Sequence, residues 1–280
     1  MNRKQRAAVA EQTVKICNDG RYTSPSGTTV HIKHEVRSAV ESTVLYDLDD
    51  MPSRPAPRFD ERAVISVTPE STFDALARLA NDQEHLGCLN FASAKNPGGG
   101  FLGGSQAQEE ALARASALYP CLRSQFSGYY EANRANSSSL YLDLLIASPN
   151  VPFFREDDNT LLEQPIMSTV LTAPAPNASA VAKNEPENRS KVEATLVRRA
   201  ELILRAAAIH EIDTLVLGAW GCGVFGNDPS TVASVFQVWL GTDHEYERHF
   251  RNVVFAVYDP DDKKGNYSGF ANVFGQSQLA

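Results

Sequence analysis

Short runs of β-branched and aliphatic residues alternate with helical stretches from about Arg62 onward, and this alternation most restricts the fold. Strands are predicted over residues 63–68, 87–92, 141–147, 169–173, 214–219 and 253–258. Helices are predicted over residues 71–80, 108–119, 190–208 and 229–240. Because strands that alternate with helices build parallel or mixed sheets covered by helices, the pattern predicts an α/β sandwich.

The first 61 residues follow another pattern. Residues 3–18 predict a helix, Ser24-Pro25-Ser26-Gly27 predicts the turn of a hairpin, and residues 52–57 form a proline-rich connection. A chain of 280 residues suits one large domain, with or without a helical addition. We therefore expect residues 1–61 to be a helical and irregular extension packed on the core, and residues 62–280 to form the main domain.

Charge and cysteine content exclude several classes of protein. The formal net charge is -8, so direct sequence-specific nucleic-acid binding is not expected, because phosphate contacts need clustered Lys and Arg. Cys17, Cys88, Cys121 and Cys222 are too scattered to indicate a zinc site or a disulfide framework. With no signal-peptide core and no run of about 18 apolar residues, we expect no membrane partner and a cytoplasmic protein.

A first glycine-rich loop follows the strand predicted over residues 87–92. It contains Gly98-Gly99-Gly100, and a helix is predicted to begin near Gln108-Glu109-Glu110. The N–H groups of such a loop and helix start can face an anion, and glycines let a ligand approach the main chain. A flexible surface turn remains the alternative. The loop is neither a Rossmann fingerprint nor a P-loop, since no Gly-Lys-Ser/Thr follows it.

Glu109 and Glu110 place two carboxyl groups at this helix start. Neighbouring helical positions diverge by roughly 100°, so we expect one carboxylate to face a ligand and the other to brace a loop or to meet a second ligand group. Repulsion and burial would raise the pKa of one of them, which suits general-acid work on a glycosidic bond. The alternative is that acidic residues are simply favoured in a first helical turn.

A second glycine-rich loop runs from Gly218 to Asn227, again between a predicted strand and a predicted helix. Two such loops at the carboxyl ends of strands indicate one crevice for a phosphorylated ligand. Phe225 lies among glycines, where its ring is open to stack on a base or ribose; packing on the following helix is the alternative. Cys222 has no histidine nearby in sequence and fits a small buried residue better than a nucleophile.

The two loops together resemble a known family. Gly98-Gly99-Gly100, then seven residues, then Gln108-Glu109-Glu110 is similar to the signature of poly(ADP-ribose) glycohydrolases, in their compact microbial branch. The resemblance continues through the segment Ser148–Arg155 and the Gly218–Asn227 loop. It implies a macrodomain-like fold, a three-layer α/β/α sandwich with a mixed central sheet, in which residues 62–280 form the catalytic domain.

The resemblance also implies roles for residues. Glu110 would be the catalytic acid and base, and Glu109 would hold ribose hydroxyls. No metal and no cofactor are implied. The implied ligand-binding residues are Asn90, Gly98, Gly99 and Gly100 at the distal ribose and diphosphate, Gln108, the diphosphate loop of Gly221, Cys222, Gly223, Val224 and Phe225, and Glu70 at the adenine.

The implied activity is hydrolysis of ribose–ribose O-glycosidic bonds from chain ends, which releases ADP-ribose from poly(ADP-ribose) and ADP-ribosylated proteins. The aromatic residues of segment 266–274 are expected to cover the adenosine end of the crevice. Two alternatives stay open. One is a macrodomain that only binds ADP-ribose, for which adjacent glutamates would not be needed. The other is an unrelated α/β nucleotide enzyme, which would be expected to carry a P-loop lysine or a Rossmann fingerprint.

Overall fold

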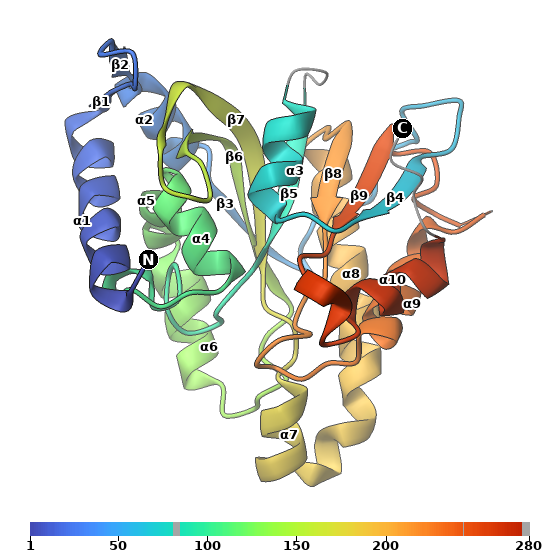
Figure 1. Cartoon of the computed structure of the whole chain (residues 1–280). Helices are drawn as coiled ribbons and strands as arrows, with labels where there is room; N and C mark the ends of the chain where they lie inside the picture. The colour runs from blue at the N-terminus through green and yellow to red at the C-terminus, as the bar shows by residue number, and fades with distance from the viewer. Residues whose placement is uncertain (81–84, 243, 276–280) are drawn as a thin grey trace.

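The structure of the protein is a computed structural model, which describes residues 1–80, 85–242 and 244–275. Its centre is a seven-stranded sheet in the order β3-β6-β7-β5-β8-β9-β4, shown in Figure 1. The strands of this sheet are β3 (Val44–Asp47), β4 (Val64–Thr68), β5 (Leu86–Phe91), β6 (Leu144–Arg155), β7 (Leu161–Ala173), β8 (Thr214–Leu217) and β9 (Asn252–Ala256). A separate hairpin pairs β1 (Arg21–Thr23) with β2 (Thr29–His31).

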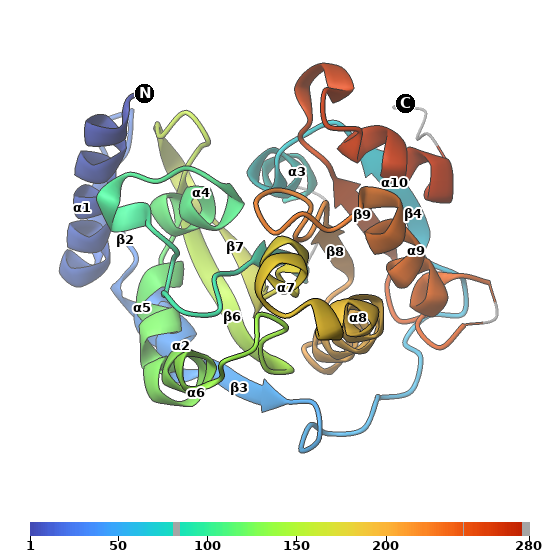
Figure 2. The same cartoon turned by 90° about the horizontal axis from the view of Figure 1, so that it is seen from below.

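The sheet is mixed, as expected. Strands β7, β5, β8, β9 and β4 run parallel to one another. Strand β6 pairs antiparallel with both β7 and β3. The carboxyl ends of the parallel strands therefore meet at one edge. Figure 2 looks onto this edge, where the chain leaves β5 and β8 as loops.

Helices cover both faces of the sheet, which gives the predicted three layers. One buried apolar cluster joins the sheet to α8, α9 and α10, and a second joins it to α2, α3, α4 and α5. The α-helices are α1 (Arg3–Asp19), α2 (Lys33–Glu41), α3 (Thr72–Leu79), α4 (Gln108–Ala115), α5 (Leu118–Ser124), α6 (Ala132–Ala135), α7 (Ala178–Asn184), α8 (Val192–Ile209), α9 (Pro229–Leu240) and α10 (Asn266–Phe274).

The side chains of β8 show why this chain forms layers. Leu215 and Leu217 point into the cluster with α8 and α9, and Val216 points into the cluster on the opposite face. Successive side chains of a strand alternate between faces, so an entirely apolar strand must be covered on both sides. Burying each such side chain contributes about 1.5–3 kcal/mol.

The first 61 residues supply α1, the β1–β2 hairpin, α2 and β3. Asn2 caps α1, and its side chain accepts a hydrogen bond from the Gln5 N–H. The predicted helix and hairpin are thus present. Strand β3, which the sequence analysis did not predict, pairs with β6 at the edge of the central sheet.

Two local predictions are wrong. The helix predicted over residues 108–119 is two helices, because Ser116 is extended and its backbone bridges to Phe153. The capping box inferred from Ser190 does not form, since α8 begins after Lys191 without a side-chain cap. At the start of α9, in contrast, the Asp228 carboxylate accepts the Thr231 N–H at 2.8 Å, as predicted.

The carboxyl-terminal helix α10 packs on the sheet through aromatic rings. The Phe274 ring stacks on Phe255 of β9 at 4.5 Å between centroids, and the Phe270 ring lies 5.3 Å from the same residue. These aromatic side chains belong to the core between α10 and the sheet. That this segment covers the adenosine end of the crevice stays a prediction.

Candidate active site

Two carboxyl groups converge on one glycine in the loop between β5 and α4. A β-carbon placed on Gly99 would lie 2.5 Å from Glu110 Oε1 and 3.1 Å from Glu109 Oε2. Gly99 has a φ of +59°, a conformation that glycine adopts at no steric cost. Although their Cα positions diverge around the helix, flexible side chains bring both carboxyl groups to the same place. Which of the two faces the scissile bond stays a prediction.

Glu110 is held by the glycine run itself. Its Oε1 accepts a hydrogen bond from the Gly100 N–H at 2.9 Å, and 9% of the residue is exposed. The loop thus fixes the direction of this carboxylate while leaving part of it open. A carboxyl group that is both fixed and accessible can take part in proton transfer.

Glu109 lies deeper, with 4% of the residue exposed. Its Oε2 accepts the Ser93 N–H at 2.7 Å, whereas its buried Oε1 has no hydrogen-bond partner. Burial, assisted by the charge of Glu110, raises the pKa of the Glu109 carboxyl from 4.5 to about 8. Near neutral pH this group is therefore mostly protonated and can donate a hydrogen bond.

Asn90 lies beside Glu109 at the carboxyl end of β5. Its side chain is fully buried, and its Nδ2 donates to Thr172 Oγ1 at 3.2 Å. Its Oδ1 has no partner. This oxygen can therefore accept a hydrogen bond from a ligand or from water.

Two tyrosines that the sequence analysis missed share this environment. Tyr129 and Tyr130 are fully buried, and neither hydroxyl has a hydrogen-bond partner. Burial raises the pKa of both, and the charge of Glu109 adds to the effect. They lie in η2 (Phe126–Glu131), a π-helix, an uncommon conformation that is frequent at functional sites. Nothing in the local sequence distinguishes this segment from an ordinary helix.

The side-chain amide of Gln108 makes three hydrogen bonds within the protein. Its Oε1 accepts the Phe91 N–H at 2.8 Å, and its Nε2 donates to Leu89 O at 2.7 Å and to Thr72 Oγ1 at 3.2 Å. The amide therefore joins the start of α4 to the end of β5 and to α3. These bonds occupy its polar groups and hold the glutamates against the strand.

The second glycine loop, between β8 and α9, is held against the central sheet where it leaves β8. Trp220 is fully buried and its indole N–H donates to Ala173 O at 3.0 Å. A β-carbon on Gly218 would lie 2.4 Å from Ala256 O, so the main chain passes too close to β9 for a side chain. Asn227 Nδ2 donates to Gly221 O at 3.1 Å and closes the loop.

The tip of this loop is open. A β-carbon on Gly223 would meet no atom within 4 Å, so protein packing does not require glycine there. Val224 is 90% exposed, and the half-buried Phe225 ring lies 6.0 Å from the Tyr141 ring. Burial raises the pKa of the Cys222 thiol to about 12, which leaves it unreactive as a nucleophile.

Glu70 precedes α3, where the sequence analysis put an adenine contact. Its carboxylate accepts a hydrogen bond from Arg78 Nε at 3.2 Å within a two-point ion pair. An adenine amino group would have to compete with this arginine for the same oxygens.

A family model described as "Microbial-type PARG, catalytic domain", where PARG is poly(ADP-ribose) glycohydrolase, matches residues 10–156. This match covers more than half of the chain and includes the first glycine loop with Glu109 and Glu110. The chain belongs to the microbial-type poly(ADP-ribose) glycohydrolase family.

Solved structures of family members agree over nearly the whole chain. A poly(ADP-ribose) glycohydrolase from Thermomonospora curvata is 42% identical with a TM-score of 0.92, over 97% of this chain and 100% of that one. The same enzyme bound to the inhibitor ADP-HPD gives a TM-score of 0.87 at 42% identity, over 96% and 99% of the two chains. The Deinococcus radiodurans enzyme in complex with ADP-ribose gives 0.79 at 43% identity, over 88% and 98%. A comparison with curated proteins gave no significant match.

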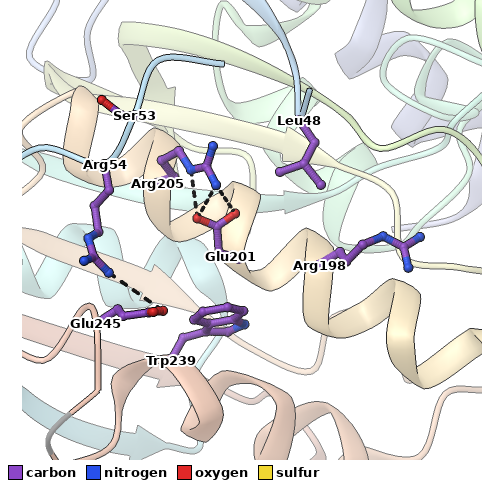
Figure 3. A pocket seen from close by; sticks show the side chains of 8 residues that line it. All are labelled: Leu48, Ser53, Arg54, Arg198, Glu201, Arg205, Trp239 and Glu245. Atoms are coloured by element: carbon purple, nitrogen blue, oxygen red, sulfur yellow. Dashed lines mark hydrogen bonds and ion pairs between the residues drawn. The ribbon is translucent and has the colours of Figure 1, made fainter. Parts of the chain in front are cut away.

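Two hollows lie away from the glycine loops of this family member. One, of about 610 Å³, is lined by α8, α9 and the segments that follow β3 and α9 (Figure 3). There Arg205 pairs with Glu201, and Arg54 lies 3.7 Å from Glu245. A second, of about 600 Å³, follows β3 and carries Asp47, Asp49 and Asp50. Neither of the two is lined by Glu109 or Glu110.

Among the described residues, no group of three or more His, Cys, Asp or Glu side chains could hold a metal ion. No helix in the described part of the chain has the length and apolar character needed to cross a membrane.

Proposed function

We propose that this chain hydrolyses the ribose–ribose O-glycosidic bonds of poly(ADP-ribose), including polymer attached to proteins, and releases ADP-ribose. The observation that carries the proposal is the pair of carboxyl groups that meet at Gly99, beside a loop rich in N–H donors. Membership of the glycohydrolase family and likeness to the complexes with ADP-HPD and ADP-ribose support it. A module that only binds would not need two buried carboxyl groups at this point.

In this proposal Glu110 is the general acid and base. In its protonated form Glu110 passes a proton to the leaving ribose oxygen while the C1–O bond breaks and an oxocarbenium-like centre develops. The resulting carboxylate then accepts a proton from the attacking water. One carboxyl group serves both steps, unlike the usual glycosidase pair with separate acid and base or nucleophile.

Glu109 and Asn90 would position the sugar. The protonated Glu109 carboxyl can donate to a ribose hydroxyl, and the orphaned Asn90 Oδ1 can accept from one. Both atoms then gain the partners that they lack, which offsets their burial.

The two glycine loops would hold the rest of the ligand. Gly98, Gly99 and Gly100 would face the distal ribose and diphosphate, and Gly221, Cys222, Gly223 and Val224 would surround the diphosphate. The unfilled space at Gly223 supports a close approach by phosphate oxygens. Phe225 would stack on the ligand. Glu70 stays a candidate for the adenine, provided that it leaves Arg78.

Other parts of the proposal are broader. Residues 1–61 would be an extension and residues 62–280 the catalytic domain, in a cytoplasmic protein without sequence-specific nucleic-acid binding. The net charge of -8 supports the last point.

The substitution Glu110→Gln tests the central assignment. Gln keeps the shape but has no proton to transfer, so turnover on polymer should fall by about 10²–10⁴-fold. ADP-ribose affinity, measured by calorimetry, should persist because loop N–H groups hold the diphosphate. Glu109→Gln should be milder, since it retains a hydrogen-bond donor.

Thermal stability of each variant serves as the control. Near-full turnover in stably folded Glu110→Gln would show that another group is the acid. Wild type that binds ADP-ribose but releases none from polymer would favour the binding module instead.

Cleavage from chain ends is the finer part of the proposal, and its support is the resemblance to the compact microbial branch. The products of the first minutes of reaction test it. Free ADP-ribose should dominate from the start, whereas early release of long oligomers would show that the crevice accepts internal units.

A further inference from the structure

The amino-terminal helix α1 lies beside the loop between β5 and α4, at the flank of the molecule shown in Figures 1 and 2. Arg3 Nε donates to Gly103 O at 2.8 Å, and Arg6 Nε donates to Gly104 O at 2.8 Å. Both carbonyl groups belong to the turn that directly follows the glycine run, η1 (Phe101–Gly103) and its carboxyl-terminal cap. Two arginines that are 100 and 98 residues away from this turn in sequence thus donate hydrogen bonds to two of its consecutive carbonyl groups.

This turn is directly connected to the Glu110 carboxylate. Gly100 donates its N–H to Glu110 Oε1, and its carbonyl accepts the N–H groups of Gly103 at 3.0 Å and Ser105 at 3.1 Å. A displacement of the turn would therefore move the peptide group that fixes the direction of Glu110.

Apolar packing joins the same three elements. Ala10 of α1, Phe101 of the turn and Ala113 of α4 form a small buried cluster of their own, separate from the two clusters that flank the sheet. Thr13 extends the contact, since its hydroxyl donates to Arg114 O at 2.7 Å at the end of α4. Helix α1 thus contacts both the loop that orients Glu110 and the helix that carries it.

Gly104 shows how closely the two segments approach. A β-carbon on this residue would lie 2.0 Å from Arg3 O, and its φ of +73° already favours glycine. The fit leaves no room for a side chain between α1 and the loop.

We propose that Arg3 and Arg6 are positioning residues, which hold the 101–104 turn so that Gly100 keeps its N–H on the Glu110 carboxylate. The inference rests on the proposed function of Glu110. It gives α1 a role in catalysis although no α1 side chain touches the reacting atoms. Misplacing a catalytic group by about 1 Å can cost on the order of 10²-fold in rate, so two hydrogen bonds near the surface, one exposed and one partly buried, can matter.

The test compares the double variant Arg3→Ala/Arg6→Ala with wild type on purified poly(ADP-ribose). We expect kcat to fall by about 10-fold to 10²-fold, with KM and ADP-ribose affinity within about twofold, because only the orientation of Glu110 changes. Arg3→Lys/Arg6→Lys keeps a donor at each site and should restore part of kcat. Gly104→Ala should lower kcat in the same way, by pushing the turn away while both arginines remain.

Arg37→Ala is the matched control. Arg37 also lies on an amino-terminal helix, has a side chain that is 75% exposed, and pairs with Glu41 one turn away. It should leave kcat unchanged, although it removes one positive charge from a helix of the same extension, where the double variant removes two.

Several outcomes overturn the inference. Unchanged kcat in the double variant does so directly. A rise in KM alone would show that the arginines attract the polymer, and a loss that follows the melting temperature would show a merely structural role. Absence of ADP-ribose release by wild type is a separate result, which contradicts the proposed function itself.

Discussion

Glu109 is a carboxyl group that the fold removes from water, and its burial links a single residue to the stability of the whole protein. Its pKa is raised from 4.5 to about 8 by burial first, with a smaller contribution from the charge of Glu110. Between these values the folded protein holds a proton that the unfolded chain has released. The stabilisation from this group is therefore complete below pH 4.5 and is lost as the pH rises towards 8.

The pH dependence of unfolding tests this reasoning. Relative to Glu109→Gln, which cannot ionise, wild type should lose stability steadily from about pH 5 to about pH 8. The limiting slope is about 1.4 kcal/mol per pH unit. The measurement is the free energy of unfolding in denaturant at several pH values. Parallel curves for the two proteins over this range would show that Glu109 ionises in the folded state much as it does in the unfolded chain.

The sequence predicts the two glutamates of the candidate site but not the two tyrosines near them. The two acids are indicated by the resemblance of Gly98-Gly99-Gly100 and Gln108-Glu109-Glu110 to the family signature, since acidic residues alone are simply favoured in a first helical turn. Tyr129 and Tyr130 could not be predicted. Their approach to Glu109 depends on a π-helix and on tertiary packing, neither of which leaves a periodic signal.

At the scale of elements, the sequence predicts strands and helices where apolar periodicity is regular and fails where it is interrupted. Helix α9 begins at Pro229, after the predicted Asp228 cap, because capping chemistry is local. Strand β6 is longer than predicted. It contains Pro149 and Asn150, and its register with β7 shifts between Ser148 and Val151. Such a bulge breaks the alternation on which strand prediction relies.

The loop between β5 and α4 yields a prediction of its own. Gly99→Ala should lower turnover by at least about 10-fold, because the added methyl displaces both carboxyl groups and small misplacements are costly. Its conformational strain should also lower stability by about 1 kcal/mol. Turnover and melting temperature are measured together.

Gly27→Ala separates these two effects. Gly27 also has a positive φ, +87°, but lies in the β1–β2 turn, where a β-carbon would meet nothing within 4 Å. This variant should show a similar loss of stability and full turnover. Equal turnover of the two variants would mean that the carboxyl groups can move aside without cost.

At the scale of the whole molecule, the layers follow from the sequence but the strand order does not. Apolar strands between amphipathic helices require helices on both faces. Strand β3 joins the sheet next to β6, although nearly 100 residues separate them in sequence. The four residues of β3 are half-exposed or exposed, so the apolar pattern that indicates a buried strand is missing.

The donors that surround the site lead to a last prediction, which concerns metal ions. Glu109 Oε2 and Glu110 Oε1 each accept a main-chain N–H group, and glycine-rich loops contribute more N–H groups at the same edge of the sheet. Such groups attract anions and oppose a cation. No cluster of metal-binding side chains occurs among residues 1–80, 85–242 and 244–275. Release of ADP-ribose should therefore continue at an unchanged rate in excess EDTA. Loss of activity on chelation, with recovery on adding magnesium or zinc, would mean that a cation completes a site that these carboxyl groups alone do not.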